Sequence, residues 1–438
     1  MENKNKTQYL CLENWVHAVM RPEQLLLYNT LTGQSIISDK EQHRAIVAAM
    51  HERHNLGVIA FEPTWAEDIA ISQFIEEAIA KNIFSIEETP TGELKPIRLM
   101  PVLNIQKNVE RLKQESDRSA GEMSLSYLTE LTLYVNDFCS LNCSHCGQSH
   151  KQFICCSKGT NGSILDTSVL TKIVAQIKHA PILKLNIIGG DIFSYPLLNE
   201  IPEIFNAQKE KIHFWTHYKN FRVPIRHCGL DPQSPENGTM LKQVQHDDAI
   251  HKETIWDIVV DFPVDEQVLS ACVSANVKEK TQYRYHFIVQ NEEEVNLVEK
   301  MTTDYEIQDF EMHPYYNGEN IDFFKTCIFL NKEDILGSTV SQRRIFCNQA
   351  LNSNFFGSLT VLPSGDVVAN LNAPVLENIA TTPVLTLITK ELEQNTAWRK
   401  TRNEYPCNAC LFQYLCPPIS NYEMTFQREN LCTLYENT

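Results

Sequence analysis

The stretch that decides the fold is ELTLYVNDFCSLNCSHCG, residues 130–147. Its first part, ELTLYV, is apolar and rich in strand-forming residues, so it predicts a buried β-strand. Cys139, Cys143 and Cys146 follow this strand directly with the spacing C-x3-C-x2-C. Three thiolates on one short loop can hold three irons of a cubane cluster, which normally has four cysteine ligands. The missing ligand leaves one iron open, as catalytic metal sites require.

The chain on either side of this loop alternates between strand-like and helix-like segments. The expected strands are ILKLNII (182–188), KIHFWTHY (211–218), TIWDIVVDF (254–262), YRYHFIV (283–289) and YEIQDFEM (305–312). Helical patterns lie between them, which predicts parallel βαβ units in an open sheet or a barrel. Residues 222–248 interrupt the alternation and are rich in Pro, Gly, Asn and Asp, so we interpret them as a surface insertion.

A second motif follows about forty residues after the cysteine loop. The next strand ends in IIGGD, with Gly189, Gly190 and Asp191 at its carboxyl end. Barrel enzymes place their chemistry on that face of the sheet. The cysteine loop and the GGD sequence together resemble the radical S-adenosylmethionine (SAM) superfamily, although that family has Glu where this chain has Asp191.

The resemblance implies a fold, cofactors and roles for several residues. The fold would be a partial (β/α)6 barrel over residues 125–335. Cys139, Cys143 and Cys146 would hold a [4Fe-4S] cluster whose open iron binds SAM, and reductive cleavage of SAM would yield a 5′-deoxyadenosyl radical. Gly189, Gly190 and Asp191 would seat the methionine part of SAM. Asp261 follows a strand where a ribose or methionine contact is expected, but an ordinary strand-end Asp explains it equally well. The alternatives for the cysteines themselves are a zinc loop and three unrelated thiols.

The C-terminal region carries a second cysteine group. Cys407, Cys410 and Cys416 have the spacing C-x2-C-x5-C, and Cys432 follows them. A hairpin, SLTVLPSGDVVANL (358–371), precedes the group. Residues 343–438 resemble the SPASM domain of peptide-modifying radical SAM enzymes, which implies an auxiliary [4Fe-4S] cluster on these four cysteines.

Two expected cysteines are missing from this C-terminal pattern. Asn370 and Ser420 stand where the SPASM pattern has cysteines, so the resemblance implies the loss of a second auxiliary cluster, with Cys347 as its orphan. The alternative for the remaining four cysteines is a structural zinc site, because four thiolates suit tetrahedral zinc. Cys155 and Cys156 are interpreted as structural, and His145 and His313 receive no role.

Composition limits the partners and the compartment. The 438 residues carry a formal charge of −17, which argues against a nucleic-acid or anionic-membrane surface. No apolar run is long enough for a membrane span, and the N-terminus lacks the pattern of a signal peptide. We expect a cytoplasmic protein, in which the 14 cysteines serve metal binding more readily than disulfides.

Within the N-terminal residues 1–115, LLLYNTLTGQSI (25–36) predicts two strands around a turn that contains Asn29 and Gly33. EQHRAIVAAMHERH (41–54) and ISQFIEEAIAKNIF (71–84) then predict two helices, and a polar connection follows. This order resembles the winged-helix-like leader-recognition domain of peptide maturases, although a generic α+β cap fits as well. The sequence therefore leads to the hypothesis of a radical SAM enzyme that modifies a ribosomally made precursor peptide, with an electron donor such as flavodoxin or ferredoxin. The alternatives are a non-catalytic relative that binds the peptide or a partner maturase, and an enzyme that resembles the sulfatase maturases.

Overall fold

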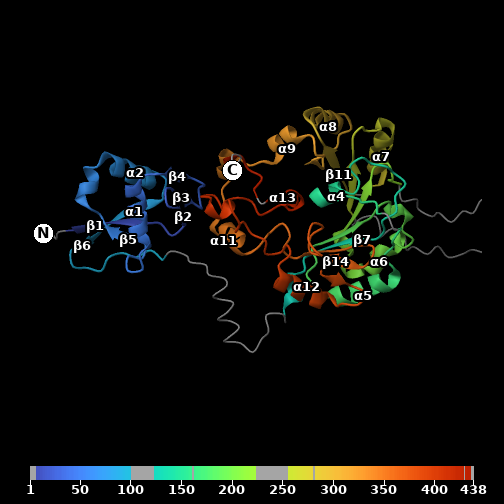
Figure 1. Ribbon diagram of the computed structural model, residues 1–438, viewed down its shortest axis with the longest axis horizontal. Coiled ribbons are helices and arrows are strands. Elements are labelled where there is room, and N and C mark those ends of the chain that lie inside the picture. The colour runs from blue at the N-terminus through green and yellow to red at the C-terminus, as the bar shows by residue number, and fades with distance from the viewer. Residues whose placement is uncertain are drawn as a thin grey trace, which may run out of the picture.

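The computed structural model describes residues 6–99, 123–159, 162–222, 255–279, 282–428 and 430–435. An N-terminal unit and a larger α/β unit lie side by side, and the larger unit carries both cysteine groups (Figure 1). The predicted surface insertion lies outside the described residues except for Arg222 at its start. Residues 100–122, between the two units, also lie outside them.

The N-terminal unit contains two antiparallel sheets of three strands, ordered β5-β1-β6 and β2-β3-β4. The predicted strand pair around Gly33 and the two predicted helices are confirmed. The strands are β1 (Lys6–Leu12), β2 (Val16–Met20), β3 (Leu25–Asn29), β4 (Ser35–Ser38), β5 (Val58–Ala60) and β6 (Phe84–Pro90). The helices are α1 (Glu41–His51), the short η1 (Pro63–Ala66) and α2 (Ile69–Ala80).

Strand β3 joins the N-terminal unit to the rest of the protein. Leu25 and Leu27 pack into the core formed with α1 and α2, whereas Leu26 packs on the opposite face against the C-terminal region. The hydroxyl of Tyr28, on that second face, accepts a hydrogen bond of 2.8 Å from the backbone N–H of Val340. A strand buried on both faces needs a continuous apolar run, which explains the sequence LLLY.

The larger unit is built on one sheet of nine strands with the order β12-β11-β10-β9-β8-β7-β13-β14-β15. The strands β7 to β13 run parallel, and β14 and β15 are antiparallel additions. The strands are β7 (Glu130–Tyr134), β8 (Lys184–Ile188), β9 (Ile212–His217), β10 (Ile255–Val260), β11 (Gln282–Val289), β12 (Phe310–Pro314), β13 (Ser358–Val361), β14 (Asp366–Val368) and β15 (Glu377–Asn378). In the described residues, β12 and β15 are the edges and the sheet does not close, so the partial barrel stays a prediction.

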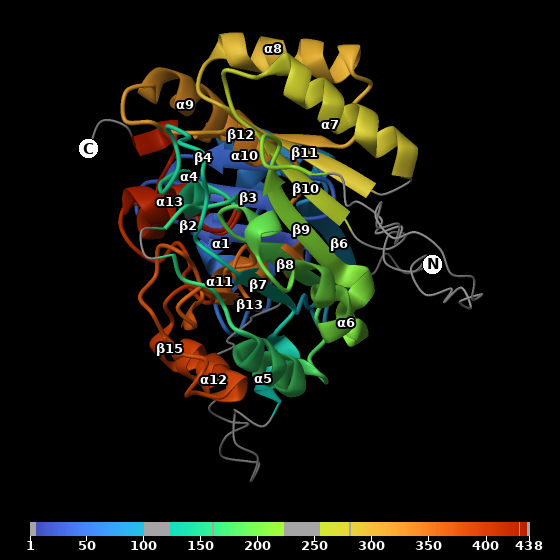
Figure 2. The same ribbon diagram turned by 90° about the vertical axis from the view of Figure 1, so that its right-hand side faces the viewer.

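Helices cover the outer face of this sheet, and Figure 2 shows α7 and α8 beside β10 and β11. The helices of the larger unit are α4 (Ser149–Gln152), α5 (Thr167–Ile177), α6 (Ile201–Ile204), α7 (Glu266–Glu279), α8 (Glu292–Asp304), α9 (Ile321–Ile328), α10 (Lys332–Leu336), α11 (Gln342–Ala350), α12 (Val384–Gln394) and α13 (Asn421–Phe426). Short 3-10 helices are η2 (Ser124–Tyr127), η3 (Ile192–Ser194), η4 (Leu198–Glu200), η5 (Asn206–Lys211), η6 (Cys407–Ala409) and η7 (Thr433–Tyr435).

Alternation along the strands separates the two faces of the sheet. In β10, Trp256 and Ile258 pack on the helix-covered face, whereas Val259 packs on the inner face with Trp215 and Ile288. Successive side chains of a strand point to opposite faces, so Asp257 and Asp261 share the inner face with Val259. Full burial of each large apolar side chain contributes about 1.5–3 kcal/mol before cavity terms.

The hairpin predicted at residues 358–371 is confirmed, with Gly365 at a φ of 84° in its turn. The structure adds a feature that the sequence did not predict. Strand β13 of this hairpin pairs in parallel with β7, so the C-terminal region extends the central sheet. This pairing occupies the edge of β7 that would otherwise be exposed.

Candidate functional site

The loop after β7 brings three predicted cysteines to one small cavity. Cys139, Cys143 and Cys146 line it together with Gly190 and His217. The side-chain amide of Asn220 donates a hydrogen bond to the Cys139 sulfur at 3.5 Å. The backbone N–H of Lys158 donates to the Cys146 sulfur at 3.3 Å. These donors suit sulfur atoms that carry negative charge.

The two glycines of the GGD sequence allow the end of β8 to approach this loop. A Cβ atom on Gly190 would lie 2.2 Å from the backbone oxygen of Phe138 and 3.1 Å from the Cβ of Cys139. A Cβ atom on Gly189 would lie 2.5 Å from the side-chain oxygen of Asn136. The backbone N–H of Gly190 also donates to the Asn136 carbonyl at 3.1 Å. Only glycine fits such a close approach of two backbones.

Asp191 has local partners in this structure. Its carboxylate accepts a hydrogen bond of 3.1 Å from the backbone N–H of Phe193 at the start of η3. Its second oxygen lies 3.4 Å from the guanidinium of Arg222. Gly190 lines the cysteine cavity, and Asp191 is not among the residues that line it. The expected contact of Asp191 with the methionine part of SAM therefore stays a prediction.

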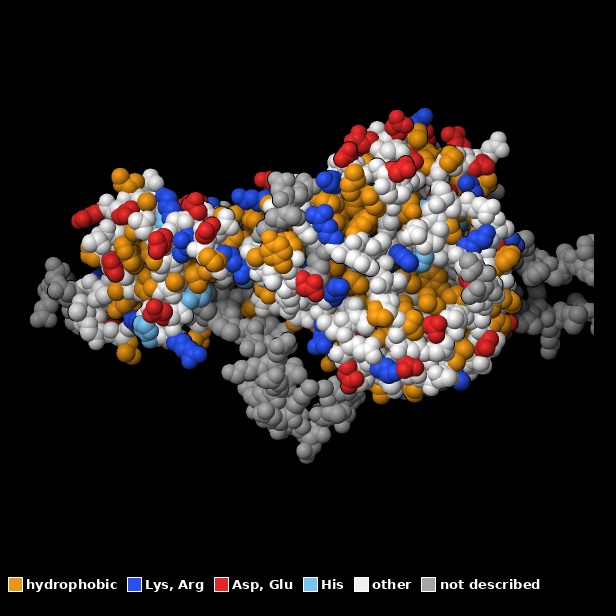
Figure 3. Space-filling model, viewed as in Figure 1, with side chains coloured by type: hydrophobic (Ala, Val, Ile, Leu, Met, Phe, Trp, Pro, Cys, Tyr) orange, Lys and Arg blue, Asp and Glu red, His pale blue; other side chains and the backbone are white. Residues whose placement is uncertain are grey.

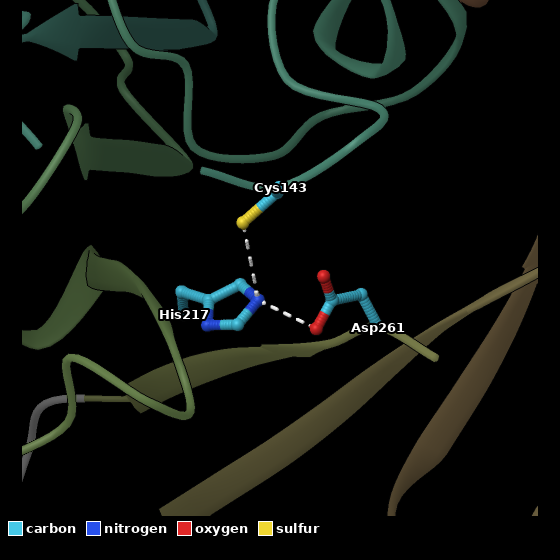
Figure 4. A group of neighbouring side chains, drawn as sticks. All are labelled: Cys143, His217 and Asp261. Carbon is cyan, nitrogen blue, oxygen red and sulfur yellow. Dashed lines mark hydrogen bonds and ion pairs between the residues drawn. The ribbon is translucent and has the colours of Figure 1, made fainter. Parts of the chain in front are cut away.

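Asp261 lies beside the cysteine loop at the end of β10, next to His217 at the end of β9 (Figure 4). The Nε2 atom of His217 is 3.0 Å from an Asp261 oxygen and 3.9 Å from the Cys143 sulfur. The Nδ1 atom of His217 accepts from the backbone N–H of Lys219 at 3.2 Å. Nε2 therefore carries the proton and donates to Asp261.

The electrostatics of this group keep Asp261 ionised and Cys143 protonated when no metal is bound. Burial raises the pKa of Asp261, but the hydrogen bond from His217 and the charges of His217, His145 and Lys219 lower it further, below its ordinary value. Burial, with a further contribution from Asp261, raises the pKa of Cys143 to about 12. Metal binding deprotonates such a thiol, so any metal or cluster here must supply strong positive charge.

The second predicted group is also brought together. Cys407, Cys410, Cys416 and Cys432 line one cavity with Leu330, Ile335 and Leu431. Cys432 reaches it because its segment forms a bridge beside Leu330. Groups of three or more metal-ligand atoms within 4.8 Å occur twice among the described residues, and neither group includes these cysteines.

A buried ion pair supports the C-terminal group. The guanidinium of Arg402 lies 2.7 Å from an oxygen of Glu423 and 3.9 Å from the Cys407 sulfur. Both Arg402 and Glu423 are buried. Burial raises the pKa of Cys416 to about 12, while the charge of Arg402 acts in the opposite direction.

The two positions with missing cysteines line another cavity than the four C-terminal cysteines do. Asn370 and Ser420 line a cavity of about 360 Å³, together with Tyr134 and His150. Ser420 begins α13 as its N-cap in a capping box with Glu423, and the amide of Asn370 donates to Asn421 at 2.6 Å. Both residues therefore have hydrogen-bonding roles in this protein.

Several residues that the sequence analysis did not single out contribute to these sites. His150 lines the cavity of about 360 Å³ and a neighbouring one of about 210 Å³. Its Nδ1 atom is buried without a hydrogen-bond partner in the described structure, and burial lowers its pKa to about 4. Cys156, which the sequence analysis interpreted as structural, lines the cavity of the first cysteine group. His217, Asp257 and His286 were also missed, and their signal was a polar residue inside an otherwise apolar strand.

Comparisons with known proteins do not assign the chain to a family. No protein-family model matches the chain, and a search of curated proteins finds no match. Among the described helices, none is both long and apolar enough to cross a membrane. Acidic side chains gather over α8 on the face drawn in Figure 3, and Lys and Arg are scattered there.

Proposed function

We propose that this chain is a radical SAM enzyme that modifies a ribosomally made precursor peptide at a C–H bond. The main support for this proposal is the position of the cysteine loop in the sheet. The C-x3-C-x2-C loop follows the first of six parallel strands in sequential order, and Gly189 and Gly190 pack it against the end of the second. A zinc loop needs neither the strand order nor this glycine contact.

Cys139, Cys143 and Cys146 would hold the reactive [4Fe-4S] cluster. When bound, the cluster and SAM supply a radical that removes hydrogen from an unactivated carbon. The chain's own residues have supporting roles in this proposal. Asn220 and the backbone of Lys158 donate hydrogen bonds to two of the sulfurs. Asp261 offers an ionised carboxylate beside the loop as the proposed contact for SAM.

The spacing of the C-terminal cysteines favours a cluster over zinc. Four thiolates at the zinc–sulfur distance of about 2.3 Å lie about 3.8 Å apart, well within 4.8 Å. In the described residues, Cys407, Cys410, Cys416 and Cys432 form no such close group, although they line one cavity. A cubane cluster separates its ligands further because each thiolate binds a different iron. We therefore propose one auxiliary [4Fe-4S] cluster on these four cysteines.

The substrate would occupy the cavities beside β7. Ser157 lines both the cysteine cavity and the space of about 210 Å³, and Tyr134 and His150 continue from there into the space of about 360 Å³. The unpartnered Nδ1 atom of His150 offers a hydrogen bond to a peptide group. A ribosomal peptide that enters past Asn370 and Ser420 would reach the cysteine loop along this path.

The N-terminal unit is the proposed binding site for the leader of the peptide. Peptide-recognition domains add an extended segment to an exposed sheet edge. In the described residues, β4 and β2 are the edges of one sheet, and β5 and β6 are the edges of the other. The firm packing of β3 against the C-terminal region supports the alternative of a structural cap. An electron donor such as flavodoxin or ferredoxin would complete the system.

A second candidate is a non-catalytic partner that binds the peptide or another maturase. It is favoured because the carboxylates expected to contact SAM already have partners within the protein. Asp191 caps η3 and approaches Arg222, and Asp261 accepts from His217. A protein that no longer binds SAM would satisfy these carboxylates internally in this way.

Anaerobic reconstitution with iron and sulfide, followed by a SAM cleavage assay, tests the two candidates. About eight irons per chain, with 5′-deoxyadenosine formed under reducing conditions, is expected of the enzyme with two [4Fe-4S] clusters. About four irons without 5′-deoxyadenosine would favour the non-catalytic partner. Zinc in place of iron at both groups would overturn the cluster assignment.

A further inference from the structure

A chain of polar side chains crosses the inner face of the sheet, away from both cysteine groups. Its members come from four neighbouring strands and are His213 on β9, Asp257 on β10, His286 on β11 and His313 with Glu311 on β12. Strand register aligns His286 with Glu311 and Ile288 with His313. Aligned residues of parallel strands share a face, so these side chains gather on one side.

Asp257 connects two histidines in this chain of polar side chains. It is fully buried, and its two oxygens lie 2.8 Å from Nδ1 of His213 and 2.8 Å from Nε2 of His286. A carboxylate that lies between two imidazole nitrogens accepts a hydrogen bond from each of them, so Nε2 of His286 carries the proton.

In this tautomer of His286, the lone pair of Nδ1 faces His313 and Glu311. With the proton on Nε2, a neutral imidazole has its free electron pair on Nδ1. This Nδ1 atom lies 2.9 Å from Nε2 of His313. One oxygen of Glu311 lies 3.7 Å from each of these two nitrogens. The other oxygen of Glu311 lies 3.9 Å from a guanidinium nitrogen of Arg284.

The three ligand atoms have the dimensions of a metal site. A point equidistant from the corners of a triangle with sides of 2.9, 3.7 and 3.7 Å lies about 2.0 Å from each corner, which matches the zinc–nitrogen and zinc–oxygen distances in proteins. A plain hydrogen bond between His286 and His313 would not require a carboxylate equidistant from both nitrogens. Two histidines and one carboxylate are also a ligand set of Fe(II) and zinc enzymes.

We infer that His286, His313 and Glu311 bind one divalent transition-metal ion of the zinc class, with Asp257 as the residue that orients His286. A carboxylate that holds the far nitrogen of a ligating histidine is a common second partner in such sites. His313 also lines the cavity of about 360 Å³, so the ion would lie at the wall of that space. Three protein ligands leave a position open toward a small molecule or peptide group.

Zinc binding to the full chain tests this inference after the cysteine groups have been filled by anaerobic reconstitution. Zinc is buffered with a competing chelator, and bound zinc is measured by mass spectrometry. One zinc per chain beyond the iron is expected. Glu311→Gln should weaken this binding at least tenfold, and Asp257→Asn should weaken it about 10–100-fold. The exposed His179 supplies the matched control, because His179→Ala should bind zinc as the parent protein does.

Cobalt(II) as a replacement probe separates this site from the cysteines. Nitrogen and oxygen ligands give visible d–d bands without the sulfur-to-cobalt charge-transfer band that thiolate ligation produces. Absence of the extra zinc, a thiolate band for the extra ion, or unchanged affinity in Glu311→Gln would each overturn the inference. Glu311 is half-exposed, so its variant should fold even if a His286 variant does not. Zinc binding is independent of 5′-deoxyadenosine formation, so this inference and the proposed radical chemistry can fail separately.

Discussion

The two cysteine groups differ in their surroundings as much as in their ligand number. Cys139, Cys143 and Cys146 are partly exposed on a loop, and His145, Lys158 and His217 line their cavity. The four C-terminal cysteines share their cavity with leucines such as Leu330 and Leu431 and with the buried side chain of Arg402, and Cys407 and Cys410 are buried. Three ligands in an open polar place suit a site that meets another molecule, whereas four enclosed ligands suit a closed centre.

The largest effect is expected from Cys143→Ala. The variant removes one of three ligands from the open group, so 5′-deoxyadenosine formation should fall to background and about four irons should be lost per chain. Liquid chromatography of the SAM products and iron analysis measure both effects. The exposed thiol of Cys327 provides the control, since Cys327→Ala should retain iron and activity. Full SAM cleavage in Cys143→Ala would end the assignment of the reactive cluster to this loop.

Cys416→Ala should separate the two groups. It removes a partly buried ligand of the closed group, so about four irons should again be lost, with a lower melting temperature. SAM cleavage should persist because the open group is intact, while peptide modification falls at least tenfold. Cys347→Ala is the matched control, because the proposal gives Cys347 no ligand role. Loss of iron in the Cys347 variant instead would mean that the ligand set is misassigned.

Arg402→Met tests the ion pair that encloses the closed group. The change leaves Glu423 as a buried carboxylate without its cation, which costs about 3–5 kcal/mol of unfolding free energy. Denaturant unfolding measures the loss. The double variant Arg402→Met, Glu423→Gln should recover part of it because the buried charge is gone. Equal stabilities of the single and double variants would indicate that the ion pair is not the source of the effect.

Of the proposed variants, Gly190→Ala is expected to have the smallest effect on the free energy of unfolding. It should, however, disturb the cysteine loop of the open group. The added Cβ would lie 2.2 Å from the backbone oxygen of Phe138, so the loop must shift at a cost of about 1–3 kcal/mol. Unfolding measurements and the absorption spectrum of the reconstituted cluster report the two consequences. A variant with unchanged stability and spectrum would show that β8 does not constrain the cysteine loop.

Much of the local structure follows from short-range patterns. The hairpin at residues 358–371 and the two N-terminal helices are where periodicity and turn residues predict them. The boundary of β12 was less accurate, since the predicted strand at 305–312 is observed at Phe310–Pro314. Helix α8 ends at Asp304, and its C-cap Tyr305 and the left-handed residue Glu306 occupy the start of the predicted segment. Element boundaries are decided by such tertiary and capping details, which a pattern of apolar residues does not contain.

Local sequence is enough to predict the spacing inside each cysteine group and the strand before the first group, whereas the need for glycine at positions 189 and 190 follows from the approach of residues 136–139 in the folded chain. The spacing and the strand are local features, because a loop of a few residues limits how far apart its ligands can lie. The resemblance to the SPASM domain assigned Cys432 to the C-terminal group, and the tertiary structure shows how Cys432 reaches the other three cysteines, through the bridge beside Leu330.

The chain of His213, Asp257, His286 and His313 is likewise a product of the tertiary structure. Its successive hydrogen-bonded pairs are 44, 29 and 27 residues apart in the sequence. Each residue appears in the sequence only as one polar position in a predicted strand. The order and register of the parallel strands decide which of these side chains meet, and that information lies in long-range pairing rather than in local pattern.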